Sequence, residues 1–370
     1  MDADFAARHY SAQLAATRDL TGHGRKTQAA WLREMADWIE AAGGPDPLID
    51  RRGVGPQVTE LEREVSALVG KPAAVLMPSG IMAQQAALRA WAERSGRKTV
   101  GLHAESHFLV YELNALVELH GLRPVIITES PRPTLASDLA KVPCPLGALS
   151  VELPLRDCGH VLPSWQQLVD LSQAAADRGI PFHIDGARLW ESAPFLGHSF
   201  KEIADLGDSV YVSLYKGLGA PAGAVLAGPE DFIADARRWR VRHGGNLPSW
   251  LPIAVAGRIG LHRYLPQMEK FVTSAREIAA AIDASGVART YPAPPHTNTF
   301  RVFIDAPAEA LNVAVVAYAE ATGVWSFPRD FWDTEMPGWA VAEFIVGEAS
   351  LGWQPSEIVE VITSLRDLAG

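Results

Sequence analysis

The sequence predicts an α/β domain with a mainly parallel sheet, followed by a smaller α+β domain. Between Lys71 and Gly228, short apolar runs alternate with longer amphipathic ones, as in strands connected by helices. After about Arg258, a long helical stretch leads into alternating strands and helices. The length of 370 residues suits about two domains. We therefore predict three segments: 1–44, which packs with the small domain, 45–258, the large domain, and 259–370, the small domain.

Each element is predicted from its periodicity and its flanking turn residues. In the large domain, the short apolar runs predict strands at 73–77, 124–128, 147–153, 181–184, 209–214 and 223–226. The amphipathic runs predict helices at 81–94 and 164–178, the second with Ser164 as its N-cap. In the small domain we predict helices at 261–284, 308–320 and 356–368, and strands at 299–304 and 344–346.

Composition excludes several classes of function. The net charge is −10 and no long basic run occurs, so neither duplex nucleic acid nor an anionic membrane is expected as a partner. The first twenty residues are charged and lack an apolar core, and other apolar runs are too short to span a bilayer. Cys144 and Cys158 predict reduced thiols, and no Cys/His spacing indicates a metal site. We expect a cytoplasmic protein.

Polar or glycine-bearing groups follow nearly every predicted strand. Ligands of parallel α/β sheets bind beyond the carboxyl ends of the strands, so these groups are the candidates for a site. They are Ser79-Gly80, Glu105 to His107, Glu152, Asp185 to Arg188, and Tyr215-Lys216.

Lys216 lies at the end of a strand and is followed by glycines and a proline. A lysine in this position can point into a cleft, where desolvation lowers its pKa and makes it a nucleophile toward an aldehyde. The alternative is a solvated lysine in a turn.

Asp185 follows a buried strand, where a carboxylate requires a cationic partner. The pyridinium nitrogen of pyridoxal 5'-phosphate (PLP) is such a partner, and its protonation makes the ring an electron sink. Arg188 can face the same cleft and bind a phosphate or carboxylate. The alternative is an internal Asp–Arg salt bridge.

Two weaker signals accompany these residues. The turn of Ser79, Gly80 and Ile81 precedes a helix, whose N-terminal N–H groups can bind a phosphate, although many α/β turns look similar. His107 can stack on a ring or move protons, and a capping or core histidine is the alternative.

In order and wording, these segments resemble the threonine aldolase and aromatic amino acid β-eliminating lyase superfamily. Its members are PLP-dependent enzymes of fold type I, the aspartate-aminotransferase-like fold. The resemblance covers about residues 56–246. The matching segments are PSGIMAQQ at 78–85, ESH at 105–107, HIDGARLWES at 183–192 and KGLGAP at 216–221.

The resemblance implies how the cofactor is held. Lys216 would bind PLP as a Schiff base, Asp185 would pair with the pyridine nitrogen, and His107 would stack on the ring. The turn at Gly80 and Ile81, with Ser79, would hold the phosphate.

The resemblance also implies a shared site. Arg188 would bind the substrate carboxylate or help to hold the cofactor. Arg242 lies in a basic, glycine-rich stretch that in the family reaches a phosphate across a subunit interface. A homodimer or homotetramer is therefore expected.

The chain departs from the family pattern mainly at the substrate side. Ile81 and Tyr215 replace a threonine and a serine, DLTGHG at 19–24 replaces DLRSDT, and no C-terminal substrate arginine is evident. Leu155 stands where the family has a histidine beside the substrate hydroxyl, and Arg156 adjoins it. We expect Leu155 to line the pocket, and L-threonine to react less well than bulkier β-substituted amino acids. Candidates for substrate binding are Arg188, Tyr215, Arg156 and His23, and candidates for the base are Tyr215, His23, His107 and Lys216.

The resulting hypothesis is a PLP-dependent lyase acting on a β-hydroxy or β-substituted amino acid. The reaction would be retro-aldol cleavage between Cα and Cβ, or β-elimination. The alternatives are a PLP-dependent aminotransferase or racemase on the same fold, and a non-catalytic PLP-fold binding protein.

Overall fold

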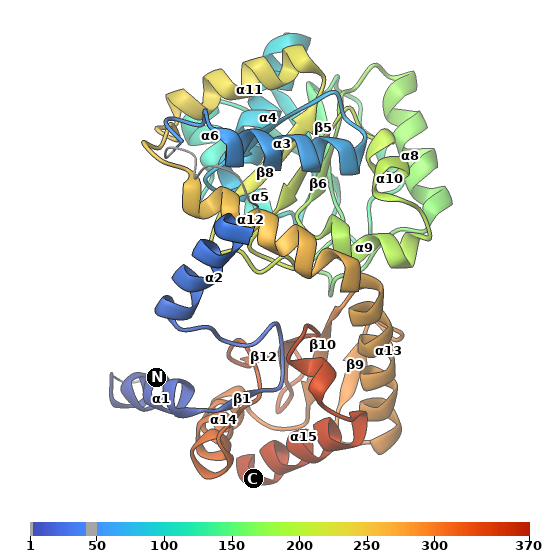
Figure 1. Ribbon diagram of the computed structural model, residues 1–370. Coiled ribbons are helices and arrows are strands. Elements are labelled where there is room, and N and C mark those ends of the chain that lie inside the picture. The colour runs from blue at the N-terminus through green and yellow to red at the C-terminus, as the bar shows by residue number, and fades with distance from the viewer. Residues whose placement is uncertain (1–2, 42–49) are drawn as a thin grey trace. The chain divides into compact units, whose positions relative to one another are not determined.

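The computed structural model describes residues 3–41 and 50–370, which form two compact units (Figure 1). The larger unit comprises residues 28–266, and the smaller unit combines residues 1–27 with 267–370. The domain boundaries at residues 44 and 258 that we expect from the sequence stay a prediction.

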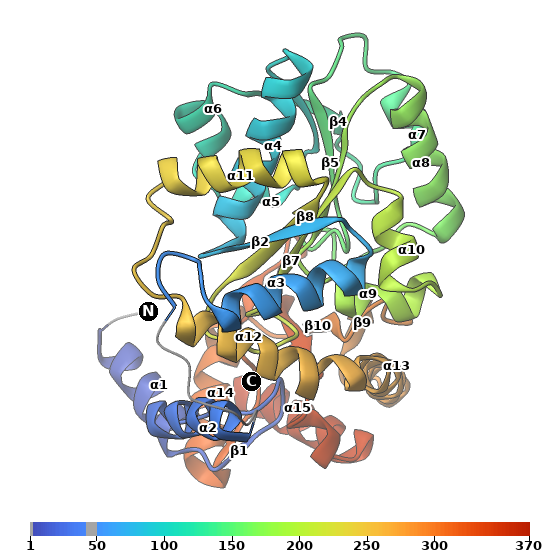
Figure 2. The ribbon, with the colours of Figure 1, turned by 45° about the horizontal axis from the view of Figure 1, so that its top comes forward.

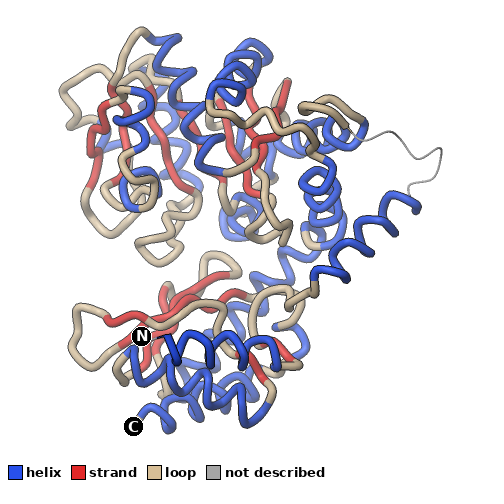
Figure 3. The backbone as a smooth tube through the Cα atoms, turned by 90° about the vertical axis from the view of Figure 1, so that its left-hand side faces the viewer, coloured by secondary structure: helices blue, strands red, loops and turns tan. Residues whose placement is uncertain are grey.

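The larger unit is built on a seven-stranded sheet with the order β2-β8-β7-β6-β5-β3-β4. Strand β8 runs antiparallel to both of its neighbours, and the other pairs are parallel, so the predicted mainly parallel sheet is confirmed. Figure 3 shows these strands among helices. The strands are β2 (Ala73–Met77), β3 (Thr99–His103), β4 (Arg123–Thr128), β5 (Ala148–Glu152), β6 (Phe182–Gly186), β7 (Ser209–Ser213) and β8 (Ala224–Gly228).

Six of these strands coincide with predicted ones, and β3 does not. Its apolar run is interrupted by Gly101. A Cβ at Gly101 would lie 2.8 Å from Leu146 and 2.9 Å from Ile127, so neighbouring side chains occupy the space of a side chain here. The glycine that weakens the strand pattern is thus required by the packing.

Helices cover both faces of this sheet (Figure 2). Helices α4 (Gly80–Ser95) and α11 (Glu230–Arg242) lie on one face, and α3 (Pro56–Val69) and α10 (Phe200–Asp205) lie on the other. The predicted N-cap of α8 (Trp165–Asp177) is confirmed, because Ser164 Oγ accepts the N–H of Gln167 at 3.2 Å. The remaining helices of this unit are α2 (Gln28–Ala41), α5 (His107–Val110), α6 (Ala115–His120), α7 (Ala136–Leu139), α9 (Leu189–Leu196) and α12 (Leu251–Arg263).

The single helix predicted at 261–284 is wrong. Helix α12 ends at Arg263, a 3-10 turn follows at Leu265–Gln267, and α13 begins at Met268 and ends at Ser285. Pro266 lies in the turn and has no N–H to donate, which explains the break within an otherwise continuous helical pattern.

The smaller unit contains a four-stranded antiparallel sheet with the order β12-β13-β10-β9. The predicted strands at 299–304 and 344–346 correspond to its central pair. Among all described helices of both units, none is long and apolar enough to cross a membrane. The strands are β9 (Arg289–Tyr291), β10 (Thr299–Ile304), β12 (Trp332–Asp333) and β13 (Ala340–Ile345), with a separate parallel pair, β1 (Arg18–Asp19) and β11 (Val324–Trp325). The helices are α1 (Ala3–Ala15), α13, α14 (Ala308–Thr322) and α15 (Pro355–Ala369).

Candidate active site

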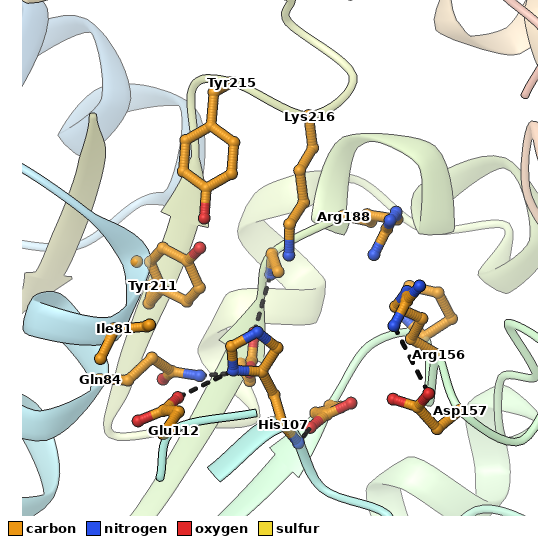
Figure 4. Close-up of a pocket in the computed structure, with 15 residues that line it drawn as sticks. Ile81, Gln84, His107, Glu112, Arg156, Asp157, Arg188, Tyr211, Tyr215 and Lys216 are labelled. Atoms are coloured by element: carbon orange, nitrogen blue, oxygen red, sulfur yellow. Dashed lines mark hydrogen bonds and ion pairs between the residues drawn. The ribbon is translucent and has the colours of Figure 1, made fainter. Parts of the chain in front are cut away.

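A pocket lies at the carboxyl ends of the parallel strands in the larger unit (Figure 4). Loops that follow β2, β3, β5, β6 and β7 contribute its walls, as expected for a sheet of this kind. The lining residues are Gly80, Ile81, Gln84, His107, Glu112, Glu152, Pro154, Arg156, Asp157, Asp185, Ala187, Arg188, Tyr211, Tyr215 and Lys216.

Lys216 follows β7 and points into the pocket toward His107 (Figure 4). Burial is the main cause that lowers the pKa of its amine to about 8, and the positive charge of Arg188 is the second cause. A Cβ at the next residue, Gly217, would lie 2.2 Å from the carboxylate oxygen of buried Glu191. Glycine is therefore needed after the lysine, because the turn packs directly onto Glu191.

Asp185 is only 3% exposed and lies on β6. Its Oδ1 accepts the backbone N–H of Ala187 at 3.0 Å, and its Oδ2 accepts the side-chain amide of Gln84. Burial raises the pKa of this carboxyl, and the nearby Lys216 opposes the shift. Both hydrogen-bond donors are neutral, so a cation placed against the carboxylate in the pocket would stabilise its charge.

His107 begins α5, and two carboxylates fix its backbone and its ring. Its N–H donates to Glu152, and its Nδ1 lies 2.9 Å from Oε1 of Glu112. Gln85 in turn donates to the other oxygen of Glu112. Burial, and then the charge of Asp185, raise the pKa of Glu152 to about 8. The imidazole is therefore held in one orientation at the pocket wall.

The N-terminus of α4 forms one end of the pocket. Ser79 is its N-cap, with Oγ accepting the N–H of Met82 at 3.2 Å, and only Gly80 and Ile81 of this turn line the pocket. A Cβ at Gly80 would lie 2.1 Å from the hydroxyl of Tyr211 and 3.2 Å from that of Tyr215. Two phenol hydroxyls thus face the end of the helix where an anion is favoured (Figure 4).

Arg156 and Asp157 form the wall after β5. Arg156 donates to the hydroxyl of Tyr111 at 2.7 Å, and that hydroxyl donates to Asp157 at 2.7 Å. The expectation that Leu155 lines the pocket is wrong. It lies 3% exposed in a small apolar cluster with Cys158 and Val161, and it pairs with Val161 in an isolated antiparallel bridge.

The structure brings together most of the predicted site residues. Arg188 and Tyr215 line the pocket with Lys216, Asp185 and His107. Arg242, in the last turn of α11, is not among the lining residues, and its guanidinium lies 4.5 Å from the ring centroid of Trp239. His23 belongs to the smaller unit, where its Nδ1 accepts the N–H of Glu348 at 3.3 Å. Roles for Arg242 and His23 stay predictions.

Five lining residues were not predicted from the sequence: Gln84, Glu112, Pro154, Asp157 and Tyr211. A signal existed for two of them. Gln84 falls within the PSGIMAQQ segment, and Tyr211 lies in a predicted strand next to that of Asp185, with which it pairs in register. Glu112 and Asp157 lie close in sequence to the predicted residues His107 and Arg156, but no sequence pattern indicates that their side chains face the pocket.

The lining side chains fit PLP. Lys216, whose pKa is lowered, can attach the aldehyde of PLP. Asp185 is a buried carboxylate whose hydrogen-bond donors are neutral, so it can pair with the pyridinium nitrogen. The N-terminal N–H groups of α4 can bind the phosphate, and the fixed imidazole of His107 can stack on the pyridine ring. The fold and the site thus define a PLP-dependent enzyme of fold type I.

The sequence comparisons identify the family. The family model for the beta-eliminating lyases matches residues 50–307, so the chain belongs to the beta-eliminating lyase family and is a PLP-dependent lyase. The low specificity L-threonine aldolase of Escherichia coli strain K12 is 29% identical over 260 residues, which cover 69% of this chain and 76% of that protein.

Solved structures of two relatives resemble the whole chain. One is a protein of Exiguobacterium sp. 255-15 assigned as an aromatic amino acid beta-eliminating lyase/threonine aldolase, 31% identical with a TM-score of 0.88. The other, from Listeria monocytogenes EGD-E, is assigned as an L-allo-threonine aldolase, 29% identical with a TM-score of 0.88. Each alignment covers 98% of this chain and 99% of the other. The predicted fold class and family are confirmed.

Proposed function

We propose that this lyase cleaves β-hydroxy amino acids between Cα and Cβ, releasing glycine and an aldehyde. The observation that carries the proposal is the convergence of Lys216, Asp185 and His107 on one pocket at the end of α4. The relatives support the same substrate class, because they include threonine aldolases with 28–29% identity.

PLP, when bound, supplies an electron sink for the charge that develops on the α-carbon. The residues of the chain would hold and orient it. Lys216 would attach the aldehyde, Asp185 would keep the pyridine nitrogen protonated, and His107 would cover the ring. Gly80 and Ile81 offer N–H groups to the phosphate, and the adjacent tyrosine hydroxyls add further donors.

We assign binding of the substrate to Arg188, Arg156 and Asp157, which also line the pocket. Arg188 would bind the substrate carboxylate, because its guanidinium lines the pocket beside Lys216. Arg156 and Asp157, joined through Tyr111, would face the β-substituent. These polar groups can contact a β-hydroxyl. The preference for bulkier β-substituents over L-threonine stays a prediction.

The test is product analysis with the holoprotein and L-threonine, L-allo-threonine and phenylserine. Glycine and aldehyde in equal amounts are expected, with no product from Lys216→Ala. Ammonia with a 2-oxo acid would instead show β-elimination. A 2-oxo acid with the cofactor converted to its amine form would show transamination. Either of these as the main outcome overturns the proposal.

We also propose that the protein is a cytoplasmic homodimer or homotetramer. Exposed apolar side chains gather around α5 and α6, where Leu113 is 92% and Leu119 65% exposed, and such surfaces are typical of interfaces. The sequence contains only two cysteines, which supports a reducing compartment. The net charge of −10 supports the absence of a nucleic-acid partner.

A further inference from the structure

A continuous row of buried hydrogen bonds leads away from the pocket behind Asp185. The amide of Gln84 donates to Asp185 Oδ2, and its Oε1 lies 2.6 Å from Nε2 of His183. The Nδ1 of His183 lies 2.8 Å from Ser209 Oγ. The indole N–H of Trp91 donates to the same Oγ at 2.8 Å. We call Gln84, His183, Ser209 and Trp91 the buried network.

The fold places these residues for contact. His183 and Asp185 are two residues apart on β6, so their side chains lie on the same face of the sheet. Ser209 pairs with His183 in the register of β6 and β7. Gln84 and Trp91 are seven residues apart on α4, about two turns, and therefore lie on the helix face that covers these strands.

The chemistry of the donors gives the network one direction when Asp185 is charged. An indole N–H only donates and a carboxylate only accepts, so the two ends are fixed. Gln84 must present its NH₂ to Asp185 and its carbonyl to His183. His183 then carries its proton on Nε2, and Nδ1 accepts the hydroxyl proton of Ser209. Every donor of the network thus points toward Asp185.

The histidine within the network is neutral. Complete burial lowers the pKa of His183 to about 3. A neutral imidazole has one donor and one acceptor nitrogen, which is what the two contacts require. Aligned hydrogen bonds polarise one another in a medium of low dielectric constant, so each bond strengthens the next toward the carboxylate.

We infer that the buried network holds Asp185 in its charged form and in a fixed orientation toward the pocket, so that Gln84, His183, Ser209 and Trp91 are positioning residues for the pyridine nitrogen. The inference rests on the proposed function, in which Asp185 keeps that nitrogen protonated. Nothing in the network touches the pocket except Gln84.

The test uses holoprotein reconstituted with PLP that carries ¹⁵N in its ring, and reads the protonation of that nitrogen by NMR. Gln84→Met should move the resonance toward the deprotonated position and lower kcat by about 10-fold with little change in KM, because one hydrogen bond to a charged group is lost. His183→Phe and Ser209→Ala should give smaller shifts, and Trp91→Phe the smallest.

The matched control is His120→Phe, which makes the same change at a buried histidine outside the network. It should leave the resonance in place. If Asp185→Asn moves the resonance but Gln84→Met and His183→Phe do not, the inference is overturned while the proposed function stands. If Asp185→Asn itself has no effect, the assignment of Asp185 in the proposed function fails. A variant that does not fold is replaced in the series by Ser209→Ala or Trp91→Phe.

Discussion

The reactivity of Lys216 follows from its surroundings. Its amine is buried and faces Arg188, and both effects disfavour the charged form, which lowers the pKa to about 8. Asp185, Glu152 and Glu191 act in the opposite direction. The lysine is therefore largely protonated at pH 6 and largely neutral at pH 9, and only the neutral amine attacks an aldehyde.

This balance predicts a pH dependence for uptake of the cofactor. The rate at which apoprotein reacts with PLP, followed by absorbance, should rise with pH, pass its midpoint near pH 8 and level off above about pH 9. Arg188→Met removes the cation that lowers the pKa, so the midpoint should move to higher pH. A midpoint in the variant that stays the same or moves down would show that Arg188 does not act on the amine.

The tyrosine hydroxyls give a second prediction at the scale of single residues. Burial keeps the pKa of Tyr211 well above its usual value, so its hydroxyl stays a donor. Tyr211→Phe should weaken the binding of PLP by about 10-fold, the cost of a hydrogen bond to a charged group, and leave the binding of pyridoxal unchanged. Tyr111→Phe, at the far wall, is the control. Equal losses for both ligands would contradict a contact with the phosphate.

At the scale of elements, strand ends and helix starts create the site. Most of these turns were accessible from the sequence, because apolar runs end at polar residues and Ser79-Gly80 precedes a predicted helix, although strand β3 before His107 was not predicted. Lys216, Asp185 and His107 were therefore identifiable. The partners supplied across elements were not, since Gln84 of α4 reaches Asp185 of β6 only after the layers pack. The break at Pro266 was present in the sequence, but periodicity on both sides concealed it.

The close approach of α4 to β7 can be tested by a pair of substitutions. Gly80→Ala introduces a Cβ 2.1 Å from the hydroxyl of Tyr211 and should lower the free energy of unfolding by about 1–3 kcal/mol, as overpacked sites do. Tyr211→Phe in the same chain should restore part of that loss, because it removes the nearest atom. Thermal unfolding of the four apoproteins measures the coupling. Purely additive losses would mean that the two residues do not meet.

At the scale of the whole molecule, the exposed apolar side chains near α5 and α6 offer a test of the proposed association of chains. Leu113, 92% exposed, belongs to this surface. Leu113→Glu would place a charge in an apolar contact and should shift the protein toward monomers in sedimentation. Leu119→Glu is a second variant on the same surface, and Met336→Glu, at an exposed site in the smaller unit, is the control. An unchanged assembly state in both variants would place the interface elsewhere.

Lys216 is the residue expected to carry the cofactor as a Schiff base. Borohydride reduction of the holoprotein should attach the cofactor permanently to a lysine, and peptide mass spectrometry should find the added mass on the peptide that contains Lys216. Lys216→Ala treated in the same way should give no labelled peptide. Labelling of another lysine in the native protein, such as Lys71 or Lys201, would show that Lys216 does not hold the cofactor.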